Sequence, residues 1–105
     1  MIKKGDKMTI KEITGEELLE LDDSYKIIDV RSEEEYKNGH IKNAINIPLE
    51  KIMANDFHLD KDDKLVIHCR TNGRSKIAIR NLKDLGFKNL ILAPGVDIYD
   101  YDLTK

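Results

Sequence analysis

An apolar run that ends at the only cysteine of the chain constrains the fold more than any other stretch. Residues 65–69 have the sequence Leu-Val-Ile-His-Cys and the length of a buried strand. After a polar loop, residues 76–85 repeat apolar side chains at helical spacing, at Ala78, Ile79, Leu82 and Leu85. The pattern predicts a strand that leads into a helix through a short loop, with one thiol at the end of the strand.

The residues around Cys69 favour a reactive thiol over a packing residue. A single cysteine in a soluble domain is usually a small buried apolar side chain. Here Arg70 and Arg74 stand beside it, and the predicted helix start supplies unpaired backbone N–H groups and the positive end of a dipole. Both features stabilise a thiolate, and Gly73 lets the loop turn tightly. We therefore expect Cys69 to act as a nucleophile.

The rest of the chain alternates between helix patterns and strand patterns. Two segments have the spacing of capping boxes, which start helices: Thr14 with Glu17, and Ser32 with Glu35. Three apolar runs have the length of buried strands, at residues 25–30, 44–47 and 89–92. Strands and helices that alternate with short connections form a parallel sheet covered on both faces. We expect a three-layer α/β fold with a central parallel sheet of about five strands.

Composition limits the classes of function. With 105 residues the chain has the size of one domain, and we expect residues 8–105 to form it after a flexible tail at residues 1–7. One cysteine excludes an internal disulfide, and no apolar segment is long enough for a membrane helix, so we expect a cytoplasmic protein with no membrane partner. The 18 basic and 20 acidic residues give a net charge of −2, which argues against nucleic acid as a partner.

The three histidines are not expected to be catalytic. His40 follows a predicted helix end with no serine or acid placed to work with it, and His58 lies in a polar connection. His68 alternates with Cys69 along the strand, so its side chain points to the opposite face of the sheet. The spacing of these residues matches no zinc motif. We expect no metal and no cofactor.

Asp29 and Arg31 are candidates to support the cysteine loop. Ligands of open α/β sheets bind beyond the carboxyl ends of the strands, so the end of the strand at residues 25–30 is expected beside Cys69. There Asp29 would accept N–H bonds or pair with an arginine, and Arg31 would add positive potential. The alternatives are a turn aspartate at position 29 and, favoured at position 31, an arginine exposed to solvent.

Three ordered blocks of the sequence resemble the rhodanese family. The first is the loop at residues 69–75, Cys-Arg-Thr-Asn-Gly-Arg-Ser. The second contains Asp29-Val30-Arg31, Glu35-Tyr36, Gly39-His40-Ile41, Ala44 and Asn46-Ile47-Pro48-Leu49. The third contains Leu82, Leu85-Gly86-Phe87 and Asn89-Leu90. The resemblance extends from Ile10 to Tyr99 and implies the same parallel α/β fold.

The resemblance also implies a sulfurtransferase. Cys69 would carry a sulfane sulfur as a persulfide, taken from a small anionic donor such as thiosulfate and passed to a thiol or cyanide acceptor, or within a sulfur relay to another protein. The substrate would be held by the loop residues Arg70, Thr71, Asn72, Gly73, Arg74 and Ser75. The two arginines would bind the anionic part of the donor, and Ser75 would cap the helix or bond to the sulfur.

One stretch departs from the family pattern. The family commonly has two adjacent glycines where this chain has Pro94-Gly95, with a tryptophan shortly after. The chain contains no tryptophan, and Tyr99 and Tyr101 are the candidate substitutes. We expect this difference to affect access to the pocket and the choice of acceptor, and to leave the cysteine chemistry unchanged.

Two other functions remain open. His68, Cys69, Arg74 and Ser75 also resemble the loop of cysteine phosphatases and arsenate reductases. Those enzymes place five residues between the cysteine and the arginine, whereas this chain places four. The other alternative is a rhodanese-like module that binds or regulates without catalysis. Such modules usually lack the cysteine, which is present here.

Overall fold

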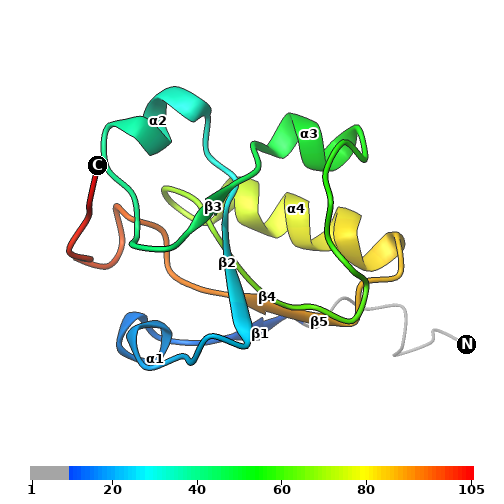
Figure 1. Ribbon diagram of the computed structural model, residues 1–105, viewed down its shortest axis with the longest axis horizontal. Coiled ribbons are helices and arrows are strands. Elements are labelled where there is room, and N and C mark those ends of the chain that lie inside the picture. The colour runs from blue at the N-terminus through cyan, green and yellow to red at the C-terminus, as the bar shows by residue number, and fades with distance from the viewer. Residues whose placement is uncertain (1–9) are drawn as a thin grey trace, which may run out of the picture.

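A sheet of five parallel strands forms the centre of the structure, a computed structural model that describes residues 10–105. The strands are β1 Lys11–Glu12, β2 Tyr25–Asp29, β3 Ile45–Asn46, β4 Lys64–His68 and β5 Asn89–Leu92, in the order β1-β5-β4-β2-β3. The helices are α1 Gly15–Leu19, α2 Glu33–Lys37, α3 Leu49–Met53 and α4 Gly73–Asp84. Helices α3 and α4 lie on one face and α1 lies on the other (Figure 1), which confirms the predicted α/β fold. The predicted tail at residues 1–7 lies outside the described residues.

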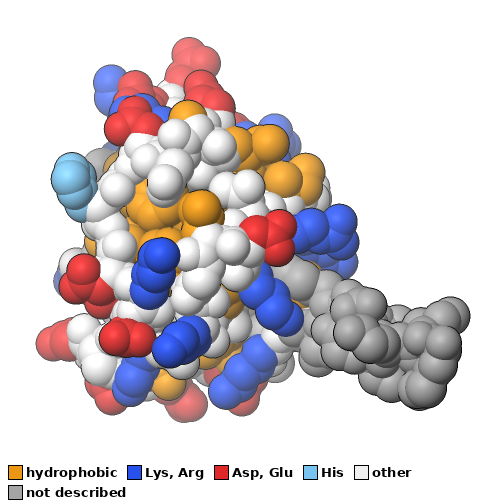
Figure 2. Space-filling view, turned by 90° about the vertical axis from the view of Figure 1, so that its right-hand side faces the viewer, with side chains coloured by type: hydrophobic (Ala, Val, Ile, Leu, Met, Phe, Trp, Pro, Cys, Tyr) orange, Lys and Arg blue, Asp and Glu red, His pale blue; other side chains and the backbone are white. Residues whose placement is uncertain are grey.

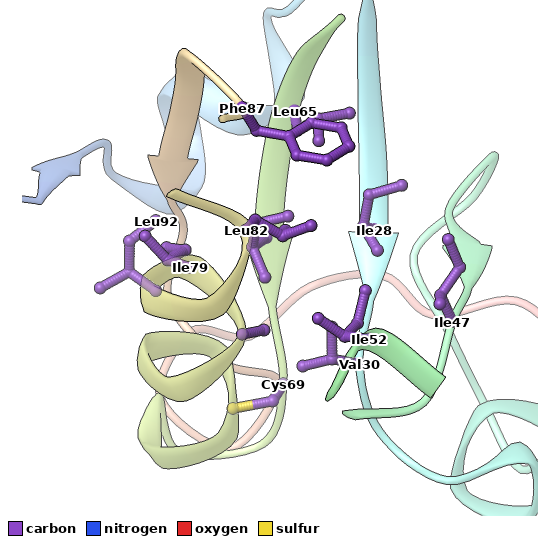
Figure 3. Packing of buried hydrophobic residues seen from close by; sticks show 12 residues of the cluster. Ile28, Val30, Ile47, Ile52, Leu65, Cys69, Ile79, Leu82, Phe87 and Leu92 are labelled. Atoms are coloured by element: carbon purple, nitrogen blue, oxygen red, sulfur yellow. The ribbon is translucent and has the colours of Figure 1, made fainter. Parts of the chain in front are cut away.

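The side chains of strand β4 alternate between the two faces of the sheet, and this alternation decides on which face the Cys69 thiol lies. Leu65 and Cys69 belong to the core between the sheet and helices α3 and α4 (Figure 3), and Ile67 belongs to the same cluster. Val66 belongs to a second core on the α1 face, and His68 is also completely buried. Successive side chains of a strand point to opposite faces, so the sulfur of Cys69 lies on the α4 side of the sheet.

Capping boxes start two of the helices, and a third helix starts earlier than predicted. Both expected capping boxes are present, since Thr14 and Ser32 accept from the backbone of Glu17 and Glu35, whose side chains bond back. Helix α4 begins at Gly73, three residues before the predicted start. The apolar periodicity that predicted this helix marks only the turns that face the core. Its first turn faces the loop and is polar.

The face turned away from the Cys69 loop is a mixed polar surface. Figure 2 shows basic and acidic side chains interspersed around a small apolar area. Within residues 10–105, no helix combines the length and the apolar character needed to cross a bilayer.

Candidate active site

The sulfur of Cys69 lies in a ring of hydrogen-bond donors. Cys69 follows β4 directly and is only 1% exposed, and its sulfur points toward the first turn of α4 (Figure 3). The backbone N–H groups of Asn72 and Ser75 donate to Sγ at 3.2 and 3.3 Å. The Ser75 hydroxyl lies 3.3 Å from the same atom. Three dipoles therefore converge on the sulfur, an arrangement that solvates negative charge without water.

The Ser75 hydroxyl connects the sulfur to the loop backbone. Its oxygen lies 3.1 Å from the carbonyl oxygen of Asn72, and a hydroxyl has a single proton to donate. With a Cys69 thiol, the S–H group can donate to Oγ while the hydroxyl donates to the carbonyl. With a thiolate, the hydroxyl proton turns to the sulfur. Ser75 thus fits both protonation states of Cys69 without moving its side chain.

Asn72 makes the turn that the sequence assigned to Gly73. Asn72 has a φ of 79°, in the left-handed region that asparagine tolerates better than most residues. Its side chain does not cap α4. Instead, its Oδ1 accepts the backbone N–H of Gly95 at 3.0 Å. Gly73 is exposed, and a Cβ built there meets nothing within 4 Å, so a tight turn does not require this glycine.

Each of the two loop arginines is paired with a carboxylate. Arg74 donates to both oxygens of Glu35, at 2.6 and 3.0 Å, and Arg70 donates from two nitrogens to Oδ2 of Asp97, at 2.7 and 3.1 Å. The hydrogen bond from Arg74 lowers the pKa of Glu35 to about 2. The same contact raises the pKa of Arg74 above its usual range. The Arg74–Glu35 pair is therefore ionised at neutral pH.

Comparison with known proteins shows the family of this chain. A family model described as rhodanese-like domain matches residues 14–97. The chain belongs to the rhodanese-like domain family. It is 36% identical over 92 residues to YtwF of Bacillus subtilis, named as a proposed sulfurtransferase, covering 85% of this chain and 89% of that protein.

Other relatives extend the comparison. YrkF of Bacillus subtilis, named as a proposed sulfur carrier protein, is 38% identical over 71% of this chain. The chain spans only 41% of the length of YrkF. Among solved structures, a rhodanese-like domain protein from Staphylococcus aureus superimposes with a TM-score of 0.78 at 29% identity, covering 90% of this chain and 97% of that one. A rhodanese-related protein from Thermoplasma volcanium gives the same TM-score at 28% identity, with coverage of 90% and 97%.

The departure from the family pattern at Pro94-Gly95 keeps the glycine that touches the active loop. A Cβ built on Gly95 falls 1.9 Å from the carbonyl oxygen of Arg70. The backbone N–H groups of Val96 and Asp97 donate to the carbonyls of Cys69 and Arg70, at 2.9 and 3.0 Å. Residues 95–97 therefore hold the start of this rhodanese loop against the sheet.

The two candidate tyrosines lie behind that segment. Tyr101 is buried, and its hydroxyl donates to the carbonyl of Pro94 at 2.7 Å. The ring of Tyr99 packs close to Gly15 of helix α1. Both therefore support the segment at residues 94–97 from the α1 face, and neither hydrogen-bonds to the sulfur.

Asp29 and Arg31 support the sheet edge and make no hydrogen bond to the sulfur. Arg31 is only 4% exposed, so the favoured prediction of a solvated arginine is wrong. Its guanidinium donates to Asp29 at 2.7 Å and to the carbonyl of Gly39 at 2.7 Å. Burial of one charge is tolerated because the other neutralises it. Asp29 is paired in register with His68, so both residues lie on the face opposite Cys69.

The three histidines differ in burial and in the contacts they make. His68 is completely buried, and its Nε2 lies 3.8 Å from Asp29, beyond hydrogen-bond distance. Burial lowers the pKa of His68, so its ring is neutral. His40 stacks on Tyr36 with ring centroids 3.8 Å apart, and His58 is exposed. Within residues 10–105, no three His, Cys, Asp or Glu side chains gather as a metal site.

Glu35 and Asp97 are the site residues that sequence reasoning missed. The sequence indicated Glu35 only as part of a capping box and of the family pattern, and not as a partner of Arg74. Nothing in the sequence pointed to Asp97. They contact arginines 39 and 27 positions away in the chain. Only the folded arrangement brings these charges together, so no local pattern could have identified them.

Proposed function

We propose that this chain transfers a sulfane sulfur through a persulfide on Cys69. The observation that carries the proposal is the convergence of two backbone N–H groups and one hydroxyl on Sγ, at the start of the 12-residue helix α4. Relatives named as sulfurtransferases and sulfur carriers support sulfur transfer in general. Thiosulfate is the simplest candidate donor. A thiol, cyanide, or the thiol of a sulfur-relay protein is the candidate acceptor.

The proposed reaction has two displacement steps. The Cys69 thiolate attacks the outer sulfur of thiosulfate, so a new S–S bond forms while the old one breaks and sulfite leaves with the bonding electrons. An acceptor then attacks the outer sulfur of the persulfide, and the Cys69 thiolate leaves. A covalent intermediate between two such steps gives ping-pong kinetics. The N–H groups of Gly73 and Arg74 lie in the first turn of α4, where the helix itself offers them no acceptor, and are candidates to donate to the outer sulfur.

The size of the ring supports sulfur over phosphate as the group transferred. Four residues separate Cys69 from Arg74, and two N–H groups of this short loop already lie within 3.3 Å of Sγ. A transferring phosphoryl group has three equatorial oxygens that must be stabilised. It therefore needs a wider ring of donors than one sulfur atom does.

Intact-mass measurement tests the proposal directly. The protein is incubated with thiosulfate or with a small-thiol persulfide, and its mass is recorded before and after addition of cyanide. We expect the mass of one added sulfur, its removal by cyanide, and no addition to the Cys69→Ser variant. Absence of the added sulfur with every donor would disprove a persulfide enzyme and leave the non-catalytic module.

A further inference from the structure

The mouth of the Cys69 loop is electrically balanced. Arg70 and Arg74 provide two positive charges, and Asp97 and Glu35 provide two negative charges within 2.7 Å of them. Glu35 also lies between the two arginines, since its Oε2 is 3.9 Å from Nε of Arg70. The charged rim around the buried sulfur therefore has no net charge.

Because the rim has no net charge, it attracts a dianion such as thiosulfate only weakly. An arginine binds an oxyanion best through two parallel N–H groups, and each arginine already uses two nitrogens on its carboxylate. A thiosulfate ion must either displace Glu35 or Asp97 or bind beside it. In both cases the carboxylates repel the ion at nearly the distance at which the arginines attract it.

The surface beside the rim suits an organic group. A depression of about 270 Å³ adjoins Arg70 and is lined in part by Val96, Leu103 and the backbone at Gly39. Leu103 is 41% exposed. The same depression includes Glu35 and Asp97 together with Arg31 and Arg70, so its charges are also balanced. It therefore offers apolar contact and mixed polar partners for an organic carrier of low net charge, which thiosulfate cannot use.

We propose that Glu35 and Asp97 set the choice of sulfur donor, disfavouring the thiosulfate dianion and favouring an organic persulfide of low net charge. This inference rests on the proposed persulfide function of Cys69. In the favoured reaction, the Cys69 thiolate attacks the outer sulfur of R–S–SH. The new S–S bond forms, the donor S–S bond breaks, and R–S⁻ leaves with the electron pair, while the proton stays on the transferred sulfur. The two carboxylates are positioning residues that act through the arginines.

Donors that differ in charge test the inference. We would measure kcat and KM for thiosulfate, for methanethiosulfonate, which offers a sulfane sulfur on a monoanion, and for cysteine persulfide, an organic donor that carries an ammonium group beside its acidic groups, with cyanide as the common acceptor. Glu35→Gln removes the charge and keeps an acceptor for the helix cap. We expect it to raise kcat/KM for thiosulfate about fivefold, mainly through KM, since one partly exposed charge contributes on this scale. The increase in kcat/KM should be smaller for methanethiosulfonate and under about twofold for cysteine persulfide.

Two variants provide matched controls. Glu34→Gln and Asp100→Asn remove the same charge from exposed carboxylates that pair with no arginine within residues 10–105. They should leave the ratio of thiosulfate to persulfide efficiency unchanged, whereas Asp97→Asn should raise it. The thiosulfate efficiency of Glu35→Gln should also fall with added salt more steeply than that of the wild type, because its rim carries a net positive charge.

The outcomes separate this inference from the proposed function. If the wild type forms a Cys69 persulfide but neither Glu35→Gln nor Asp97→Asn changes the donor ratio, the inference is wrong and the function stands. An equal change in Glu34→Gln also contradicts it, because the effect is then one of overall charge. If Glu35→Gln loses activity with every donor, the donor ratio of Asp97→Asn tests the inference: a raised ratio supports it, and an unchanged ratio contradicts it. If no donor loads Cys69 in the wild type, both proposals fail.

Discussion

The floor and the rim of the Cys69 loop differ in how they handle charge. The floor consists of the donors around Sγ, namely the N–H groups of Asn72 and Ser75 and the hydroxyl of Ser75, which is completely buried. The rim consists of the Arg70–Asp97 and Arg74–Glu35 pairs, and the side chain of Arg70 is 54% exposed. Fixed dipoles in a buried site act at full strength, whereas exposed charges are screened. The floor therefore governs the reactivity of the sulfur, and the rim adjusts which donor reaches it.

The largest expected effect comes from disturbing the support beneath the floor. In Gly95→Ala, the new Cβ would lie 1.9 Å from the carbonyl oxygen of Arg70, a backbone atom that no rotamer change can move. We expect a stability loss of about 3 kcal/mol or more, measured by urea unfolding. Displacement of the loop by even about 1 Å should lower sulfur transfer on the order of a hundredfold. Gly73→Ala is the control, since its Cβ has free space, and normal activity in both variants would show that residues 95–97 do not position the floor.

Changing the size of the floor has the next largest effect. Insertion of one glycine between Asn72 and Gly73 moves the Ser75 donors away from the sulfur. We expect sulfur transfer to fall on the order of a hundredfold, because the aligned geometry of the reacting atoms is lost. The wild type should hydrolyse aryl phosphates at a negligible rate, and the wider loop could admit a phosphate. Cys69-dependent phosphatase activity in the wild type, without sulfur transfer, would instead identify a phosphatase.

Local patterns predicted the floor better than the rim. The strand, the loop and the helix around Cys69 follow from periodicity, and the orientation of His68 follows from alternation along β4. The start of α4 was missed because it depends on the left-handed turn at Asn72, which leaves no apolar signature. The ion pairs of Arg70 and Arg74, and the burial of Arg31, depend on tertiary neighbours that no local stretch of sequence specifies.

Removing one arginine tests the rim at a smaller scale. Arg74→Ala leaves Glu35 as an uncompensated negative charge near the sulfur, so we expect kcat/KM to fall about tenfold for thiosulfate and by less for cysteine persulfide, which the charge repels less strongly. Arg70→Ala should reduce it by only about threefold, because that arginine is more exposed and its charge is better screened. Steady-state kinetics with thiosulfate and cysteine persulfide provide the comparison. If Arg70→Ala lowered kcat/KM more than Arg74→Ala does, the Arg70–Asp97 pair would be the more important of the two ion pairs.

The smallest expected effect is the contribution of the rim to stability at low pH. Arg74 lowers the pKa of Glu35 from 4.5 to about 2. Because the folded state binds this proton less readily than the unfolded chain, the contribution is complete above pH 4.5 and is lost as the pH falls toward 2. Wild type should therefore exceed Glu35→Gln in unfolding free energy at pH 6 by less than about 1 kcal/mol, since the pair is partly exposed. The difference should shrink by pH 3, as followed by urea unfolding monitored by circular dichroism. A constant difference between wild type and Glu35→Gln would mean that the Arg74–Glu35 pair adds no charge-dependent stability.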